Sequence, residues 1–255
     1  MEIDYVKCCD CVDGMGSLPD GCVDLTVTSP PYDSLRKYDG YSFDFEAIAS
    51  ELYRVTKDGG VVVWVVGDQT KNGSESGTSF RQALYFMEIG FNLHDTMIYQ
   101  KANYIPLTHN RYEQSFEYMF VFSKGKPKAF NPIMVPCKGA GKQETYGEGR
   151  RKQIDPNQSM RSDGFRVIAT KDTKIHPNIF TYTCGADKTG HPAPFPYKLA
   201  EDNVLSWSNE GDLILDPMCG SGTTLLAAKN YNRHYIGFDC SEGYCEISRI
   251  RTENV

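Results

Sequence analysis

The chain has 255 residues, 40% of them hydrophobic, which is enough for one large α/β domain or a core domain with an insertion. The sequence has no apolar run of about 18 residues, and its first residues, MEIDYVKCCD, lack the layout of a secretion signal, so we expect a cytoplasmic protein without a membrane span. The net charge of −6 argues against a protein that coats nucleic acid with its whole surface, and nine unevenly spaced cysteines exclude a disulfide framework. Cys8, Cys9 and Cys11 have no second pair at ligand spacing, so no metal site is expected.

Segments typical of strands and helices alternate along the chain. Before residue 124, apolar spacing predicts helices at 45–53 and 78–89 and strands at 22–28, 61–66, 95–101 and 116–123. Gly59-Gly60 is expected to close the first helix and Gly90 the second. After residue 196, the pattern predicts a helix at 197–205, a strand at 213–215, a helix at 223–230 and a strand at 235–238. This order favours an α/β fold with a mostly parallel, doubly wound, Rossmann-like sheet.

The segment 124–174 has no periodicity and is rich in Gly, Pro, Lys and Arg. It holds twelve Lys or Arg against five Asp or Glu, although the whole chain is acidic. Positive charge with interspersed aromatic residues favours contact with nucleic acid over a surface loop without a partner. We expect Arg150, Arg151 and Lys152 to bind DNA phosphates.

The last third of the chain carries a nucleotide-binding pattern, in which a strand ends at Asp216 and Thr223 opens a helix after a Gly-x-Gly turn. Gly220 and Gly222 allow a tight turn, and N–H groups at the helix start attract a carboxylate or phosphate. A dinucleotide site is the natural alternative, but the third glycine of G-x-G-x-x-G is missing. Asp216 suits the ammonium group of S-adenosylmethionine better than a pyrophosphate, and Asp239 is placed to accept hydrogen bonds from ribose hydroxyls.

The second motif is Ser29-Pro30-Pro31-Tyr32, a rigid loop directly after a strand. The exocyclic amino nitrogen of cytosine or adenine is a poor nucleophile because its lone pair is delocalised into the ring. Acceptors held against its N–H bonds make it more tetrahedral, and Ser29 Oγ with a carbonyl of the Ser29-Pro30 segment can supply them. Tyr32 would stack on a base swung out of the duplex, although the motif alone also fits an ordinary proline turn.

Together these motifs resemble those of the amino-methyltransferases of DNA, which make N4-methylcytosine or N6-methyladenine, in the permuted order called the beta group. The resemblance covers nearly the whole chain, with the S-P-P-Y loop at 29–32 first and the D-P-M-C-G-S-G-T-T motif at 216–224 last. It implies an S-adenosylmethionine-dependent methyltransferase fold, with 1–124 and 175–255 as the catalytic domain and 125–174 as a target-recognition insertion.

Other positions match the family's landmarks. The resemblance implies that Asp10 reaches the adenine of the cofactor and that the H-P-x-x-x-P element beginning at His191 closes over its methionine end. Tyr99 and Lys101 match a segment near the base pocket, with a plain core role for Tyr99 left open, and Cys219 departs from the family pattern. The residues assigned to the cofactor are Asp10, Cys11, His191, Phe195, Pro196, Asp216, Pro217, Cys219, Gly220, Ser221, Gly222, Thr223, Phe238 and Asp239. Those assigned to DNA are Arg36, Lys37, Lys101, Arg150, Arg151 and Lys152.

The resemblance also bears on the target base. S-P-P-Y and H-P-x-x-F-P are more typical of cytosine-N4 enzymes, whereas D-P-P-Y with H-P-T-Q-K-P is typical of adenine-N6 enzymes, so cytosine N4 is favoured and adenine N6 is the alternative. Further alternatives are a methyltransferase of the same fold that acts on RNA, protein or a small molecule, and a DNA-binding protein that has lost catalysis. The expected partner is double-stranded DNA in a restriction-modification context, and a homodimer and a cognate endonuclease are candidate partners.

Overall fold

The computed structural model describes residues 1–31, 43–104, 111–138, 143–146, 166–169, 171–184 and 196–254, with only the backbone for 143–146 and 166–169. The chain divides into two compact units, Met1–Asn131 with Asn178–Val255, and Pro132–Pro177. The assignment of 125–174 to target recognition stays a prediction.

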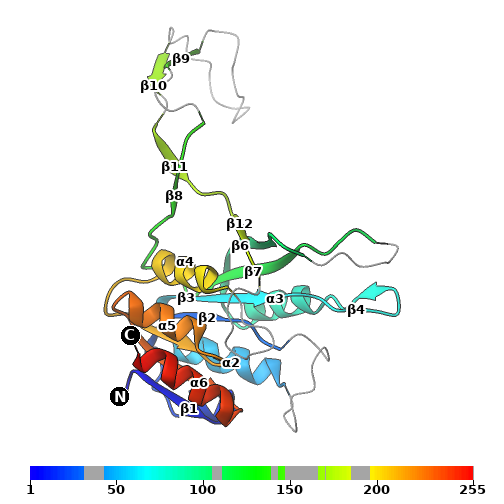
Figure 1. Ribbon diagram of the computed structural model, residues 1–255, viewed down its shortest axis with the longest axis vertical. Coiled ribbons are helices and arrows are strands. Elements are labelled where there is room, and N and C mark those ends of the chain that lie inside the picture. Colours follow the sequence, from blue (N-terminus) through cyan, green and yellow to red (C-terminus); the bar gives the residue numbers. More distant parts are fainter. Residues whose placement is uncertain are drawn as a thin grey trace. The chain divides into compact units, whose positions relative to one another are not determined.

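An eight-stranded sheet is the centre of the first unit (Figure 1). In spatial order its strands are β1 (Tyr5–Cys8), β14 (His234–Asp239), β13 (Leu213–Asp216), β2 (Val23–Thr28), β3 (Thr56–Val66), β7 (Phe116–Ser123), β6 (Asn92–Lys101) and β12 (Ile179–Tyr182). All neighbouring pairs are parallel except those of β7, which is antiparallel to both β3 and β6. The prediction of an α/β fold with a mostly parallel sheet is confirmed.

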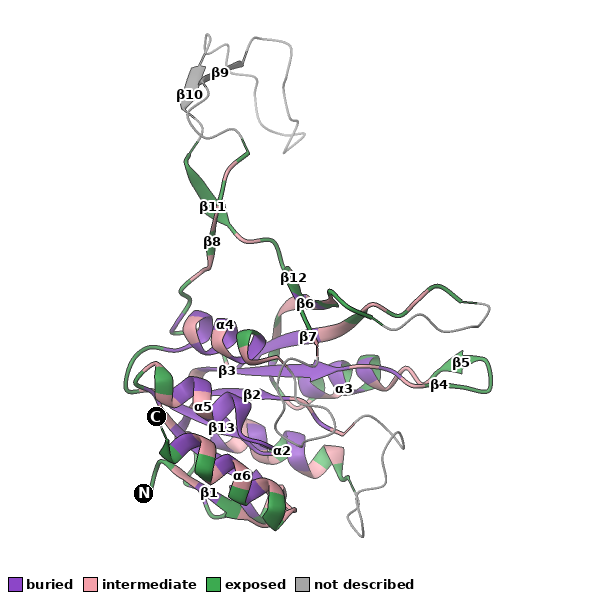
Figure 2. Cartoon of the chain, viewed as in Figure 1, coloured by how far each residue is buried: buried purple, intermediate pink, exposed green. Residues whose placement is uncertain are grey.

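Helices cover both faces of this sheet (Figure 2). One face packs against α1 (Cys11–Gly16), α2 (Phe45–Val55) and α3 (Thr78–Glu88), and the other against α4 (Tyr197–Trp207), α5 (Thr223–Asn230) and α6 (Glu242–Glu253). The central strands are buried between the two layers, since every residue of Val61–Val66 is at most 1% exposed. The sheet is therefore doubly wound, as the alternating pattern predicts.

The strand order reverses between β13 and β2. From β13 the chain passes through α5 to β14 on one side, and from β2 it passes through α2 to β3 on the other. In open α/β sheets, ligands bind outside the carboxyl ends of the strands at such a switch point. Both predicted chemical motifs follow these two strands.

One predicted boundary is wrong, because Gly59-Gly60 does not close α2. The helix ends at Val55, where Thr56 turns to extended backbone and its Oγ1 donates a hydrogen bond of 2.6 Å to Leu52 O. The glycines lie inside β3, where the register against β2 jumps from Thr56 to Val61, and Gly59 has φ +83°. The two glycines therefore allow an irregularity within β3 and do not end α2.

The remaining strands are short. In the first unit β4 (Thr70–Lys71) pairs with β5 (Ser74–Glu75). The second unit contains two antiparallel pairs, β8 (Met134–Pro136) with β11 (Thr173–Ile175) and β9 (Gln143–Tyr146) with β10 (Arg166–Ala169). The segment in which we expected only loops thus contains short ribbons.

Candidate active site

The loop after β2 and the turn after β13 lie directly beside each other. The two strands pair through Ile214 with Leu25 and Leu215 with Thr26. At their carboxyl ends, the buried Thr28 Oγ1 donates a hydrogen bond of 2.7 Å to Asp216 Oδ1. A second bond, from Thr224 Oγ1 to the carbonyl of Val27, measures 3.1 Å. The two predicted motifs therefore share one corner of the sheet, as transfer between a donor and a base requires.

Three of the four S-P-P-Y residues are described. Pro30 is buried, and Ser29 and Pro31 are half-buried at the end of β2. The proline rings fix φ of both residues, so the backbone carbonyls that precede them have little freedom. Tyr32 lies outside the described residues.

The glycine-rich turn is held by α6. Gly222 has φ +74°, and a Cβ there would overlap Ser248 Oγ and lie 3.1 Å from Ser248 Cα. The Arg251 guanidinium donates a bond of 2.6 Å to the carbonyl of Ser221. The turn is therefore packed tightly against α6, and Gly222, the N-cap residue of α5, offers no side-chain hydrogen bond to the helix. The first N–H groups of α5 are suited to bind an anionic group.

Asp216 is a buried carboxylate, only 1% exposed. Its Oδ1 accepts from Thr28 Oγ1 at 2.7 Å and from Met218 N at 3.2 Å. Burial raises the pKa of Asp216 to about 6, and these hydrogen bonds, together with one from Thr224, oppose the rise. The carboxylate therefore joins the end of β2 to the glycine-rich turn, and near neutral pH it is largely ionised.

Two further acids lie on the neighbouring strands. Asp239 accepts through Oδ2 from Gly220 N and through Oδ1 from Ser241 N, both at 2.9 Å. Asp10 follows β1, whose Cys8 is in register with Asp239, and its Oδ1 caps α1 by accepting from Val12 N at 2.8 Å. Backbone donors thus orient both carboxylates at the same edge of the sheet.

These groups fit S-adenosylmethionine in their chemistry. An ionised carboxylate is acceptor-only with several lone pairs, so Asp239 and Asp10 can accept further bonds from hydroxyl or amino groups. Asp216 supplies negative charge beside the turn, and the start of α5 supplies N–H donors for a carboxylate. A cofactor with ribose, ammonium and carboxylate groups needs this combination.

Comparison with known families decides the identity. A family model for N6/N4 methyltransferases, described as DNA methylase, matches residues 23–249. The chain belongs to this DNA methylase family. The methylase is 52% identical to the orphan methyltransferase M.BamHII of Bacillus amyloliquefaciens, over 93% of the chain and 91% of that protein. It is 27% identical to the type II methyltransferase M.BglII of Bacillus subtilis, over 91% of the chain but 64% of that protein.

Solved structures share the fold of the methylase. The cytosine-N4-specific PvuII DNA methyltransferase aligns with a TM-score of 0.71 at 19% identity, over 98% of this chain and 86% of that one. A DNA modification methylase from Thermus thermophilus, in a complex with S-adenosyl-L-methionine, aligns with a TM-score of 0.65 at 24% identity, over 99% of this chain and 95% of that one. These likenesses support the doubly wound architecture.

Several residues assigned to the cofactor are buried in the methylase. Phe238 is fully buried, and a Cβ on Gly14 would lie 2.7 Å from its ring. Pro217 and Cys219 are also buried, and Thr223 Oγ1 lies 3.3 Å from Nη1 of Arg251. Pro196 precedes the first residue of α4, whereas His191 and Phe195 lie outside the described residues.

Burial disfavours the thiolate form of two cysteines near this edge. Burial raises the pKa of Cys219, and it raises the pKa of Cys11 to about 12. All nine cysteines lie in the described segments, and all are free. No group of metal-ligating side chains, and no helix long and apolar enough to cross a membrane, occurs within the part of the chain that the structure describes.

Of the residues assigned to DNA, only Lys101 is described. Its Nζ forms an ion pair of 2.6 Å with Glu117 Oε1 at the end of β6. The neighbouring Tyr99 is a core residue, 3% exposed, with its hydroxyl 2.8 Å from Cys184 Sγ. Arg36, Lys37, Arg150, Arg151 and Lys152 lie outside the described residues.

Sequence reasoning missed three residues that hold the site together. Thr28 and Thr224 link β2 to the cofactor turn, and Arg251 reaches the turn from the C-terminal helix. The hydroxyls within T-S-P-P-Y and G-S-G-T-T were a usable signal, since a buried hydroxyl requires a partner. Nothing in the sequence pattern pointed to Arg251.

Proposed function

We propose that this methylase transfers the methyl group of S-adenosylmethionine to the exocyclic amino group of a DNA base, with cytosine N4 favoured over adenine N6. The observation that carries the proposal is the hydrogen bond between Thr28 and Asp216, which joins the S-P-P-Y loop to the glycine-rich turn. Only a reaction between a donor at the turn and an acceptor at the loop needs these two motifs at one corner.

The loop activates the amine. When bound, S-adenosylmethionine supplies an electrophilic methyl group on a sulfonium. Ser29 Oγ and the Ser29-Pro30 carbonyl accept hydrogen bonds from the amino N–H groups of the base, so that the nitrogen lone pair is directed at the methyl carbon. The nitrogen–carbon bond forms as the carbon–sulfur bond breaks, and the amine then loses a proton to water. Tyr32 stacks on the base that has left the duplex.

The acids divide the recognition of the cofactor. Asp239 accepts from the ribose hydroxyls, since Gly220 N and Ser241 N already fix its plane. Asp10 serves the adenine end, and the charge of Asp216 attracts the ammonium group. The start of α5 binds the carboxylate of the methionine moiety.

The names of similar proteins support the choice of substrate and context. The PvuII enzyme is described as cytosine-N4-specific, and M.BglII and M.BamHI are type II methyltransferases, so DNA of a restriction-modification site is the proposed substrate. M.BamHII is called an orphan methyltransferase, which favours a role without a cognate endonuclease. Adenine N6 is the second candidate, because the family model covers both reactions.

The test identifies the product directly. Unmethylated double-stranded DNA is treated with the protein and labelled S-adenosylmethionine, then digested to nucleosides that are separated by mass spectrometry. We expect labelled N4-methylcytosine; labelled N6-methyladenine would move the proposal to the second base, and label only in an RNA control or in no nucleoside would overturn it. Ser29→Ala should abolish product formation, whereas Ser74→Ala, on the exposed strand β5, should not.

A pair of variants separates the two halves of the site. Tyr32→Ala should lower turnover strongly while cofactor affinity stays near normal, because Tyr32 is assigned to the base. Asp239→Ala should weaken cofactor binding in calorimetry and recover turnover at saturating cofactor. Equal loss of both properties in both variants would contradict the division of roles.

A further inference from the structure

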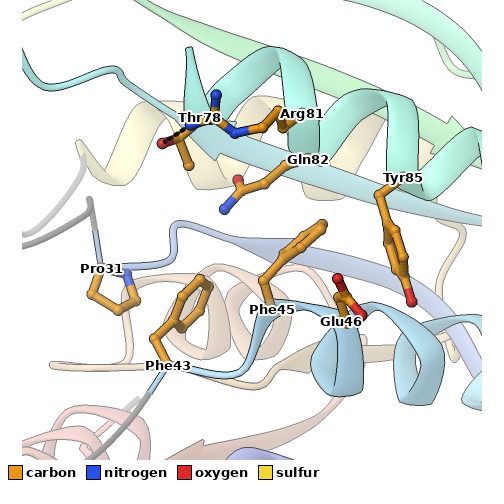
Figure 3. Close-up of a pocket in the computed structure, with 8 residues that line it drawn as sticks. All are labelled: Pro31, Phe43, Phe45, Glu46, Thr78, Arg81, Gln82 and Tyr85. Carbon is orange, nitrogen blue, oxygen red and sulfur yellow. Dashed lines mark hydrogen bonds between the residues drawn. The ribbon is translucent and has the colours of Figure 1, made fainter. Parts of the chain in front are cut away.

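A hollow lies beside Pro31, between α2 and α3 (Figure 3). Its volume is about 350 Å³, within the range of small-ligand pockets. Pro31 forms one wall, Phe43 and Phe45 another, and Gln82 projects from α3. Among the described residues, none assigned to the cofactor lines it, and α5 and α6 pack on the other face of the sheet from α2 and α3.

Gln82 is a polar side chain held in one orientation. It is 4% exposed, and its Oε1 accepts a hydrogen bond of 2.9 Å from Nε1 of the fully buried Trp64. Because an indole N–H can only donate, the carbonyl end of the amide must face Trp64. The amide nitrogen then points into the hollow, as Figure 3 shows. An amide nitrogen that faces a pocket favours a ligand that offers an acceptor.

The other walls favour a flat ring. Phe45 packs edge-on against Trp64 and Tyr85, with ring centroids 5.9 and 5.5 Å apart, so its position is fixed. Phe43 is 38% exposed and lies at the mouth of the hollow. Arg81 donates through Nη2 to the carbonyl of Ser76 at 2.7 Å and to Thr78 Oγ1 at 3.4 Å, and its guanidinium carries further N–H donors. Aromatic walls, the oriented Gln82 donor, the Arg81 guanidinium and the Glu46 carboxylate, which can accept from an amino group, suit a nucleotide base.

The position of the hollow argues against the target base as its occupant, because α2 and α3 pack on one face of the sheet and α5, which follows the glycine-rich turn, packs on the other. A base that receives the methyl group must lie between Ser29 and the turn after β13, on the β13 side of the loop. The hollow lies on the β3 side, where α2 and α3 pack. Extrusion of the target base leaves the opposite base unpaired and leaves each neighbour on the same strand with one unstacked face. Extrusion of a second base from one of these positions therefore costs less free energy than extrusion from an intact duplex.

We propose that the hollow between α2 and α3 binds a second, unstacked base of the DNA, whose ring nitrogen or carbonyl oxygen accepts a hydrogen bond from Gln82 Nε2. The proposal rests on the proposed function, which supplies the DNA substrate. The base comes either from the position opposite the target or from a neighbour of the target on the same strand.

The test is a binding cycle between protein and DNA. Once the methylated position is known, duplexes are made that carry a single abasic site opposite the target, at either neighbour, or at the target itself. Their affinities are measured by fluorescence anisotropy with the wild type and with Gln82→Met, which keeps the length of the side chain but cannot donate. Gln114→Met, a change of an exposed glutamine outside the hollow, is the matched control.

For the intact duplex we expect Gln82→Met to bind about tenfold more weakly than the wild type, and Gln114→Met to bind like it. An abasic site at one position, opposite the target or next to it, should weaken DNA binding by the wild type by a similar factor. The same abasic site should not weaken binding by Gln82→Met any further, because the two changes remove the same contact. That position identifies the source of the base.

Other outcomes would overturn the proposal. If the loss of affinity from Gln82→Met multiplies with the loss from the abasic site at every position, Gln82 contacts no base. If the two losses fail to multiply only when the abasic site is at the target, the hollow holds the target base itself. Phe43→Leu, at an exposed position where folding is not at risk, should repeat the pattern, and calorimetry with S-adenosylmethionine checks that each variant is folded. A wild type that binds duplexes but yields no methylated nucleoside would contradict the proposed function, and abasic sites placed at each position of the bound duplex would then still test the second site.

Discussion

Thr28 Oγ1 lies 2.7 Å from Asp216 Oδ1, so the last residue of one parallel strand is hydrogen-bonded to the last residue of its neighbour. The two residues are 188 positions apart in the chain. Both are buried, and the bond is one of several that keep the Asp216 carboxylate ionised in an apolar setting. It therefore couples the geometry of the proposed catalytic loop to the charge of the glycine-rich turn.

Replacing Thr28 with valine should test this coupling. The variant keeps the shape of the side chain but leaves Asp216 Oδ1 with one donor fewer, which should cost about 1–3 kcal/mol of unfolding free energy in urea titrations. Cofactor affinity should fall as well, since the pKa of Asp216 rises further. Thr28→Ser keeps the hydroxyl and should behave nearly as the wild type; equal effects of the two changes would refute the role of the bond.

The raised pKa of Asp216 predicts that protein stability and cofactor affinity change in opposite directions with pH. Its pKa is about 6 in the folded protein and 3.8 ordinarily, so the folded state holds this proton more tightly than the unfolded state. The contribution to stability is therefore fully present at low pH and is lost as pH rises from about 4 to about 6, by about 3 kcal/mol. Cofactor affinity should change the other way, because only the ionised carboxylate attracts the ammonium group.

Calorimetry should find S-adenosylmethionine bound about tenfold more weakly at about pH 5 than at about pH 8. Asp216→Asn cannot titrate, so its cofactor affinity and its stability should both vary less over the same range. A wild type and an Asp216→Asn variant with the same pH profile would show that another group is responsible.

The sequence predicts the central strands and α2 well because their signals are local. Val61–Val66 and the strands flanking the glycine-rich turn are continuous apolar runs, and α2 has regular apolar spacing. The contact between Thr28 and Asp216 is not local. The order of the motifs implies that loop and turn cooperate, but only the strand pairing brings these two side chains together.

The elements that sequence reasoning missed lack apolar periodicity. The face of α6 that packs inward consists of Cys245, Ser248 and Thr252, which are small or polar. In β12 only Tyr182 is buried, because this strand lies at the edge of the sheet. Gln82 was missed for a different reason, since it lies among the buried residues of α3 beside Ala83 and only its Oε1 is hydrogen-bonded, to Trp64.

Gly222 should not tolerate a side chain. Gly222→Ala combines φ +74° with overlap of the new Cβ with Ser248, whereas Gly211→Ala has a similar φ of +82° but no atom within 4 Å. We expect Gly211→Ala to cost about 1 kcal/mol and Gly222→Ala about 2 kcal/mol more, because α6 must move. Urea unfolding of the two variants separates the cost of backbone strain from the cost of the overlap with α6. Similar losses of unfolding free energy in both would mean that α6 moves aside without a measurable cost.

The basic segment around Arg150, Arg151 and Lys152 lies outside the described residues, and its role in binding DNA rests on the sequence. Neutralising all three with glutamine should weaken DNA binding and reduce the slope of log K against log salt by up to about 3, since each phosphate contact contributes about 0.9. Arg150→Lys with Arg151→Lys keeps the charge and should keep the slope. Anisotropy titrations at several salt concentrations measure both, and an unchanged slope in the triple variant would remove the segment from the DNA interface.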